Sequence, residues 1–188
     1  NGAGKTTLIK LIMGFLTPKQ GTVRVFGLDP TRDPVDVLKR VGYLSEDREM
    51  PGWMRIHELM SYIQAFYPGW DEAYAGELRK RFELDPAAKV KALSRGERAK
   101  AALLIALAYR PELLVLDEPS SGLDPVVRRE ILSAIIRTVA DEGRTVFFSS
   151  HLLEEVERVT DHVAMIQKGK VIISAPLDTL KGQHRKLV

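Results

Sequence analysis

The stretch NGAGKTT at residues 1–7 decides the fold, because it matches the second half of a phosphate-binding loop. The complete pattern is G-x-x-x-x-G-K-[ST], and Gly4, Lys5 and Thr6 supply its last three positions. The backbone N–H groups of such a loop, with the positive end of the following helix, bind phosphate oxygens. The alternative is an ordinary glycine-rich turn before a helix. In either case we expect residues 8–16, LIKLIMGFL, to continue as that helix.

The half motif assigns a chemical role to its residues. We expect Lys5 to contact the β- and γ-phosphates of a nucleotide, and the hydroxyl of Thr6 to coordinate Mg²⁺. The first glycine of the pattern falls upstream of Asn1, so we expect the loop to begin before the sequence as given and residues 1–188 alone to bind nucleotide weakly. The other expected nucleotide-binding residues are Asn1, Gly2, Ala3, Gly4 and Thr7.

Composition and charge exclude several classes of protein. A chain of 188 residues with 45% hydrophobic residues suits one globular domain. The net charge of +3 comes from Lys181, Arg185 and Lys186, so the basic and acidic residues of 1–180 are equal in number. The composition therefore shows no excess of positive charge for binding nucleic acid. With no cysteine, the chain has no disulfide and no thiolate metal site. Its longest apolar run, at 101–109, is well short of the about 20 residues that cross a bilayer.

Short apolar runs alternate with helical stretches, which favours an α/β fold with a largely parallel central sheet. LLVLD at 113–117 is continuously apolar up to its aspartate, as expected of a central strand covered on both faces. The tail predicts a hairpin, HVAMIQ and VIIS flanking Lys168-Gly169-Lys170. The other expected strands are 22–26, 41–44 and 144–150.

A helical segment interrupts the expected sheet. The stretches IHELMSYIQAFY and DEAYAGELRKRF have helical periodicity and lie between the second and third strands. We therefore predict a P-loop core formed by residues 1–52 and 93–188, with its first strands upstream of the sequence as given. Residues 53–92 form an inserted helical subdomain, which continues into a further helix from about residue 94.

Two adjacent acids follow the central strand. Ligands of open α/β sheets bind beyond the carboxyl ends of the strands, so Asp117 and Glu118 are expected to face the phosphate loop. Asp117 is placed to hold Mg²⁺, and Glu118 to orient or deprotonate an attacking water. Adjacent buried carboxylates are costly without a nearby cation, which argues against the alternative of a solvated acidic turn.

The stretch LSRGE at 93–97 predicts a second helix start. Ser94 and Glu97 fit a capping box, and on this local pattern alone a capped helix is the preferred interpretation. The free backbone donors of a helix start can also bind an anion. The order of the motifs favours that second interpretation, because LSRGE is followed by the acidic pair, by SGLD at 121–124 and by His151 after FFSS.

The ordered set NGAGKTT, LSRGE, LLVLDEP, SGLD and SSH closely resembles the ATPase subunits of ATP-binding cassette (ABC) transporters. The resemblance covers Asn1 to about Ser174. It implies a P-loop NTPase that uses ATP and Mg²⁺, with Lys5, Glu118 and His151 as catalytic residues. It also implies a second ATPase subunit, the same chain or a related one, to which Ser94, Gly96 and Asp124 contribute in trans.

The resemblance implies further partners and a location. The family's ATPase subunits bind an integral membrane permease and lie, as peripheral proteins, on the cytoplasmic face of the cell membrane; no nucleic acid is expected. Asp124 also has a local alternative, since it precedes Pro125 and fits a helix N-cap.

Two departures from the family pattern matter. Arg95 and Glu97 stand where glycine and glutamine are usual, and we expect Arg95 to point away from phosphate, toward neighbouring carboxylates or the subunit interface. Glu46, in SEDRE, stands where glutamine is usual and is the third expected Mg²⁺ ligand beside Thr6 and Asp117. A carboxylate binds Mg²⁺ well but adds repulsion toward the nucleotide.

The leading function is therefore an ATPase that energises transport through a separate membrane-spanning partner, of the export type. The alternative is a soluble ABC-type ATPase of translation or DNA repair. Such proteins usually carry two cassettes, long coiled coils or a zinc insertion, none of which appears here. A small-molecule kinase with a P-loop is a third class, for which LSRGE, SGLD and His151 lack a purpose.

Overall fold

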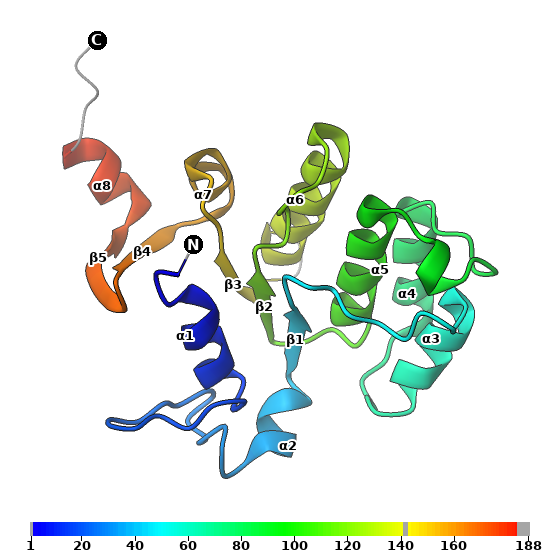
Figure 1. The fold of residues 1–188 in the computed structure, drawn as a ribbon, viewed down its shortest axis with the longest axis horizontal. Coiled ribbons are helices and arrows are strands. Elements are labelled where there is room, and N and C mark those ends of the chain that lie inside the picture. Colours follow the sequence, from blue (N-terminus) through cyan, green and yellow to red (C-terminus); the bar gives the residue numbers. More distant parts are fainter. Residues whose placement is uncertain (1, 141–142, 184–188) are drawn as a thin grey trace.

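The computed structural model describes residues 2–140 and 143–183 (Figure 1). In this part of the chain the main sheet has three parallel strands in the order β1-β2-β3. Their registers pair Tyr43 with Val115 and Val115 with Phe147. The largely parallel sheet predicted from the sequence is confirmed. The strands are β1 (Val41–Leu44), β2 (Leu113–Asp117) and β3 (Thr145–Ser149).

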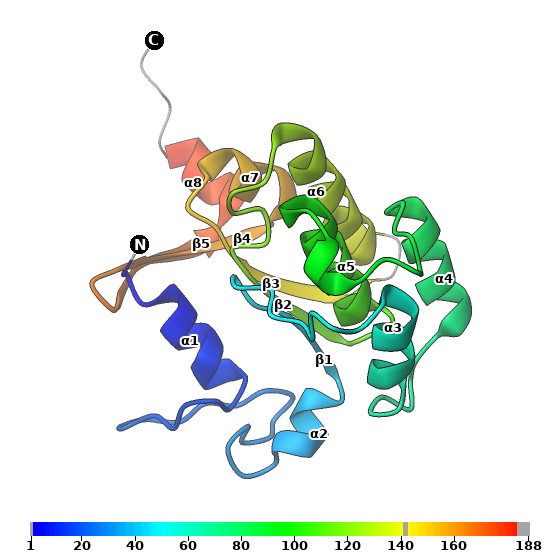
Figure 2. The same ribbon diagram turned by 45° about the vertical axis from the view of Figure 1, so that its right-hand side comes forward.

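Helices cover both faces of this sheet (Figure 2). On one face Val115 packs in a cluster with Ile9 and Met13 at α1, and on the other Leu114 and Leu116 pack beneath α5 and α6. The continuous apolar run of β2 follows directly, because each successive side chain points to the opposite covered face. The covering helices are α1 (Lys5–Ile12), α5 (Arg95–Leu107) and α6 (Pro125–Ala140).

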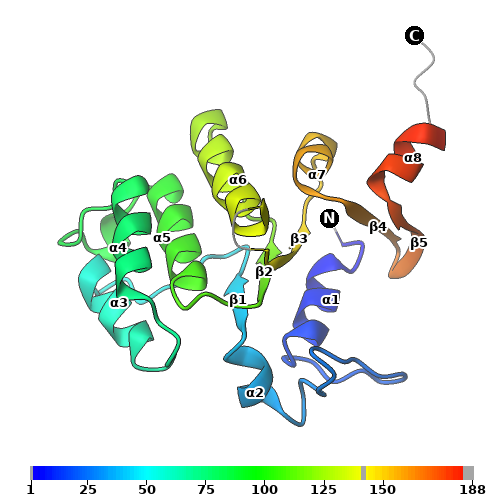
Figure 3. The same ribbon diagram turned by 180° about the vertical axis from the view of Figure 1, so that it is seen from behind.

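The predicted helical region forms beside α5, on the side of the molecule remote from α1 (Figure 3). Its buried side chains, among them Leu59 and Leu78, share one hydrophobic cluster with Leu103 and with Leu116 of the sheet. The helices are therefore where we expect them, while the domain boundaries at 52 and 93 remain a prediction. The helices are α3 (Ile56–Gln64), α4 (Glu72–Arg81) and the 3₁₀ turn η1 (Val90–Ala92).

The C-terminal hairpin is also confirmed. Strands β4 and β5 pair antiparallel, and the turn between them places both Lys168 and Gly169 at positive φ. The remaining elements are α2 (Pro34–Leu38), α7 (Leu153–Val159), β4 (His162–Gln167), β5 (Lys170–Pro176) and α8 (Leu177–Gln183). No helix of residues 2–140 and 143–183 is long and apolar enough to cross a membrane.

Two expected elements are wrong. Residues 22–26 form no strand: the chain reverses at Phe26 and Gly27, both at positive φ, so that Val25 bridges only to Leu28. The helix expected at 8–16 stops at Ile12. Gly14 then takes φ +72, a left-handed conformation that turns the chain away from the helix axis. It also lies so close to Pro30 that a Cβ on Gly14 would come 2.3 Å from the Pro30 carbonyl oxygen.

Candidate active site

Glu118 receives two side chains from distant parts of the chain. The Lys5 ammonium lies 2.5 Å from Oε1, and Nδ1 of His151 lies 2.7 Å from Oε2. Lys5 is the first residue of α1, Glu118 follows β2, and His151 comes two residues after β3. The structure thus brings together the three residues that the sequence proposes as catalytic.

The backbone around Glu118 explains this convergence. Parallel strands end at one edge of the sheet, so the segments after β2 and β3 meet there. Glu118 itself has φ 48, a left-handed conformation that non-glycine residues adopt at a cost of about 1–3 kcal/mol and that is frequent at functional sites. Gly4, with φ 110, turns the chain into α1 and aims Lys5 at the same edge.

The charge of Glu118 is set by its neighbours. Its side chain is only 6% exposed, and burial alone raises the pKa of such a carboxyl group. The hydrogen bonds from Lys5 and His151, with their charges, outweigh this effect and lower the pKa of Glu118 below its ordinary value. Glu118 is therefore an ionised carboxylate at neutral pH, which is the form that accepts a proton.

Ser149 holds both acids in place, and the sequence reasoning missed it. Its hydroxyl donates to Oδ1 of Asp117 (2.6 Å) and accepts the backbone N–H of Glu118 (3.0 Å). Asp117 is 1% exposed, so this hydrogen bond replaces water at a buried carboxylate. The signal in the sequence is the serine pair that directly precedes His151.

The phosphate loop is anchored on the C-terminal hairpin. The N–H of Gly169 donates to the carbonyl oxygen of Ala3 at 2.8 Å, and Gly2 and Gly4 both have positive φ. Thr6 and Thr7 are exposed in the first turn of α1, where backbone N–H groups lack intrahelical partners. This arrangement suits an anion. Asn1, the other expected residue, lies outside the described residues.

The donors fit Mg²⁺ in part. A threonine hydroxyl and a buried carboxylate, Thr6 and Asp117, are the hard oxygen ligands that Mg²⁺ prefers. Glu46 is exposed on the loop after β1, where its charge acts on Arg48. The described residues contain no group of three or more acidic, His or Cys side chains that could hold a metal. The three-ligand site with Glu46 stays a prediction.

Arg48 is a second residue that the sequence reasoning missed. It is 5% exposed, and its Nη2 donates to the carbonyl oxygens of Pro119 (2.9 Å), Ser121 (3.2 Å) and Glu118 (3.4 Å). Burial lowers the pKa of Arg48, and the nearby Arg95 lowers it further. Arg48 thus ties the Glu46 loop to the turn that carries Glu118. Nothing in SEDRE distinguished it from a solvated arginine.

The LSRGE segment begins α5 as the capping box predicts. The Ser94 hydroxyl accepts the Glu97 N–H (3.2 Å), and the Glu97 carboxylate accepts the Ser94 N–H (2.8 Å). Gly96 packs against Val127, where a Cβ would come within 3.0 Å of the valine side chain, so close packing is a local reason for this glycine. The contributions of Ser94 and Gly96 in trans stay predictions.

Asp124 caps α6. Its Oδ1 accepts the N–H groups of Val126 (2.9 Å) and Val127 (3.0 Å), and these bonds, that of Val127 foremost, lower the pKa of Asp124. The local alternative for Asp124 is confirmed, and its role at a subunit interface stays a prediction.

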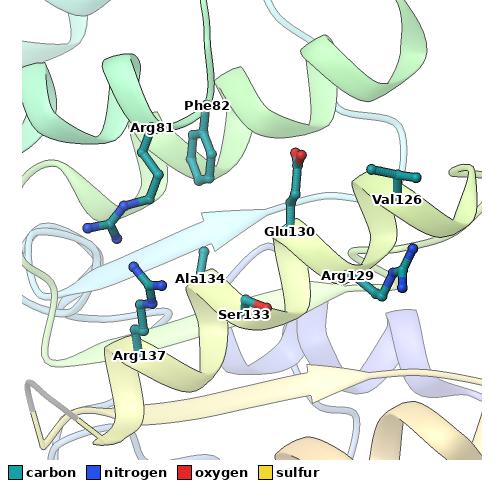
Figure 4. Close-up of a pocket in the computed structure, with 8 residues that line it drawn as sticks. All are labelled: Arg81, Phe82, Val126, Arg129, Glu130, Ser133, Ala134 and Arg137. Atoms are coloured by element: carbon teal, nitrogen blue, oxygen red, sulfur yellow. The ribbon is translucent and has the colours of Figure 1, made fainter.

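A separate groove of about 360 Å³ lies between α4 and α6 (Figure 4). Arg81, Arg129 and Arg137 line it, but Arg81 is paired with Glu77, and Glu130 on the groove wall is paired with Lys100. The groove shares no residue with the cluster around Glu118 and adds no group to its chemistry.

Residues 1–121 match the family model described as ABC transporter. The chain belongs to the ABC transporter family. Over 98% of the chain it is 34% identical to the ABC transporter ATP-binding protein NatA of Bacillus subtilis, of which it covers 77%. Other similar proteins are the ABC transporter ATP-binding protein YtrB of Bacillus subtilis (29% identity, 100% of the chain) and the bacitracin transport ATP-binding protein BcrA of Bacillus licheniformis (34%, 99%).

Solved ABC structures share the fold. An ATP-binding subunit of an ABC transporter superposes with a TM-score of 0.87 at 27% identity, over 97% of this chain and 78% of that one. A dimeric ATP-binding cassette bound to ADP and Pi gives a TM-score of 0.81 at 21% identity, over 93% and 81% of the two chains. The chain spans 64% of YtrB and 61% of BcrA, so it corresponds to part of these ABC proteins.

Proposed function

We propose that this chain is the ATP-hydrolysing part of an ABC transporter, and that it drives transport through a separate membrane-spanning partner. The convergence of Lys5 and His151 on the buried carboxylate of Glu118 carries this proposal. Phosphoryl transfer to water depends mainly on positioning and on compensating charge. A lysine at a phosphate loop and a carboxylate base at the strand end supply those two needs.

The residues divide the reaction between them. ATP phosphates bound at residues 2–7 give the Lys5 ammonium a new partner and release Oε1 of Glu118 for water. The oxygen of that water attacks the γ-phosphorus, and the bond between the γ-phosphorus and the ADP oxygen breaks. Glu118 accepts the proton of the water, while His151 holds the other oxygen of the Glu118 carboxylate. Thr6 and Asp117 would hold Mg²⁺, which would supply positive charge to the phosphate oxygens.

A second ATPase subunit completes the site in this proposal. Ser94 lies at an exposed helix start, and Asp124 lies at the exposed start of α6. Both helix starts can therefore meet the phosphate loop of another copy or of a related chain. ATP then holds the two subunits together, and hydrolysis releases them.

Exposed aromatic side chains suggest where the permease binds. Trp53, Tyr62 and Phe66 are 71%, 48% and 61% exposed, and the rings of Tyr62 and Phe66 are in edge contact. These side chains lie on or beside α3, in the helical region that follows the Glu46 loop. An apolar surface of this kind suits a hydrophobic partner. We propose that this partner holds the chain at the cytoplasmic face of the membrane.

The proposed direction of transport is export. The relatives include the daunorubicin resistance ATP-binding protein DrrA3 of Streptomyces coeruleorubidus and the bacitracin transport protein BcrA. Resistance to daunorubicin is consistent with its removal from the cell, and we extend that direction to this chain.

Two measurements on the full-length protein test the proposal. Wild-type protein is expected to release phosphate from ATP in a Mg²⁺-dependent reaction that Lys5→Ala abolishes. An affinity-tagged copy extracted in mild detergent is expected to co-purify with an integral membrane protein. Absence of phosphate release argues against an ATPase, and co-purification with ribosomes or DNA instead identifies the soluble alternative.

A further inference from the structure

Glu155 is a buried carboxylate that the proposed reaction does not use. It lies in the first turn of α7 and is 3% exposed. Its Oε1 accepts the Ser120 hydroxyl at 2.5 Å, and its Oε2 accepts the Ser150 hydroxyl at 2.7 Å. Each oxygen of this one carboxylate is therefore committed to a different segment of the chain.

Those two segments carry the catalytic pair. Ser120 follows Glu118 by two residues, and Ser150 directly precedes His151. With the contact between His151 and Glu118 (2.7 Å), the hydrogen bonds of Glu155 close a ring that joins the turn after β2 to the turn after β3. Ser120 is 1% exposed, so water does not readily replace the carboxylate as its partner.

Arg128 supplies the positive charge for this buried acid. Its Nε lies 3.6 Å from Oε1 of Glu155 and is itself buried without a hydrogen-bond partner among the described residues. Its Nη2 reaches the carbonyl oxygen of Leu123 in the SGLD loop at 3.5 Å. Arg128 thus lies between the SGLD loop and the carboxylate that holds Ser150.

We propose that Glu155 is a positioning residue, which keeps Glu118 and His151 in contact and links the SGLD loop to His151. The inference rests on the proposed ATPase function for its effect on rate, but not for its structural content. The competing explanation is that Glu155 only stabilises the start of α7, as any acid in a first helical turn does. Glu154, an exposed acid in the same turn, has that effect without touching either serine.

Hydrogen exchange separates the two explanations. In the full-length protein, Ser120→Ala removes one hydroxyl far from α7 in sequence. Positioning by Glu155 predicts faster amide exchange at residues 150–152 in Ser120→Ala and in Glu155→Gln, with Glu154→Gln behaving as wild type. Helix stabilisation alone predicts no change at these amides in Ser120→Ala. Because Ser120→Ala deletes a single oxygen, it serves even where Glu155→Gln fails to fold.

The rate of ATP hydrolysis supplies the second readout. Misplaced reacting groups lower kcat by about 10-fold to 100-fold, so Glu155→Gln and Ser120→Ala are expected to lose kcat on that scale while KM for ATP changes little. Ser120→Thr, which keeps the hydroxyl, restores much of the rate. Unchanged exchange in Ser120→Ala, or a kcat of Glu155→Gln equal to that of Glu154→Gln, overturns the inference. If the wild type releases no phosphate, the proposed function is wrong. The hydrogen-exchange result alone then tests whether Glu155 is a positioning residue.

Discussion

The guanidinium of Arg95 lies directly on Gly122 of the SGLD loop, where a Cβ would come 2.2 Å from Cζ. Gly122 also has φ +64, which adds about 1–2 kcal/mol of backbone strain for a residue with a side chain. We expect Gly122→Ala to destabilise the protein in denaturant titrations. The contacted atoms are the far end of the exposed, flexible Arg95 side chain, which can turn aside at little cost. The backbone strain therefore accounts for most of the loss, and Arg95→Gly in the same chain is expected to recover little of it. Full recovery contradicts this explanation.

Arg95 itself is expected to be dispensable for hydrolysis. Its side chain points at its own SGLD loop, so Arg95→Gly, which restores the residue usual in ABC proteins, retains most of the ATPase activity. The measurement is phosphate release by the full-length variant beside the wild type. Loss of most activity means that Arg95 acts on the phosphates or on the partner subunit.

Arg48 is expected to stabilise the site turn. Arg48→Met leaves the carbonyl oxygens of Pro119, which is buried, and of Ser121, which is partly buried, without this donor, at a cost of about 2–4 kcal/mol. Urea unfolding of the two proteins measures the difference. Arg32, whose side chain is 83% exposed, provides the control, since Arg32→Met is expected to stay within about 0.5 kcal/mol of wild type. Equal effects in the two variants contradict the assignment.

Ser149 is expected to support both acids through its hydroxyl. Ser149→Ala leaves the buried Glu118 N–H without its acceptor and costs about 1–3 kcal/mol. It also frees the Asp117 carboxylate to turn, so ATP hydrolysis is expected to need more Mg²⁺. Ser149→Thr keeps the hydroxyl and tests the assignment, because it is expected to lose less on both measures. Identical losses in Ala and Thr variants indicate a packing effect instead.

The stability of the folded protein is expected to depend on pH through the carboxyl group of Asp71. The Tyr74 N–H (2.9 Å) and then Arg110 (2.7 Å) lower the pKa of Asp71 below its ordinary value of 3.8. A carboxyl group whose folded-state pKa is depressed stabilises the fold fully above its unfolded pKa, and this contribution is lost as pH falls through the folded value. Asp71→Ala is expected to lower Tm at neutral pH, with a difference from wild type that shrinks below about pH 4. A difference that is constant with pH is the contrary result.

The sequence predicts the three residues that converge at Glu118 better than the residues that support them. Lys5, Glu118 and His151 could be proposed as one cluster because each stands in a fixed pattern beside a glycine, a strand or a serine pair. Arg48 and Glu155 could not, because a buried arginine or glutamate has the same local pattern as a solvated one. Only the long-range partners, the carbonyl oxygens after β2 and the hydroxyls of Ser120 and Ser150, distinguish them.

The misassigned strand at 22–26 has a similar cause. TVRVF alternates as a strand does, and Val25 is indeed buried, but Gly27 and Phe26 take left-handed conformations that end the extended chain. The alternation therefore predicted the burial of Val25 correctly, but it wrongly predicted strand hydrogen bonding for residues 22–26. The helix predicted after Lys5 was too long because apolar residues continue past Gly14 in the sequence. The close approach of Gly14 to Pro30, which accompanies the end of the helix, is a tertiary contact that the local pattern does not contain.

The rate of ATP hydrolysis by Glu118→Gln, measured with ATP affinity on the same full-length preparation, tests the central claim most directly. Glutamine keeps the shape of the side chain but is not a proton acceptor of comparable strength. The account predicts that ATP affinity is retained and that kcat falls by about 10²-fold to 10⁴-fold. A kcat close to that of the wild type would mean that Glu118 is not the base.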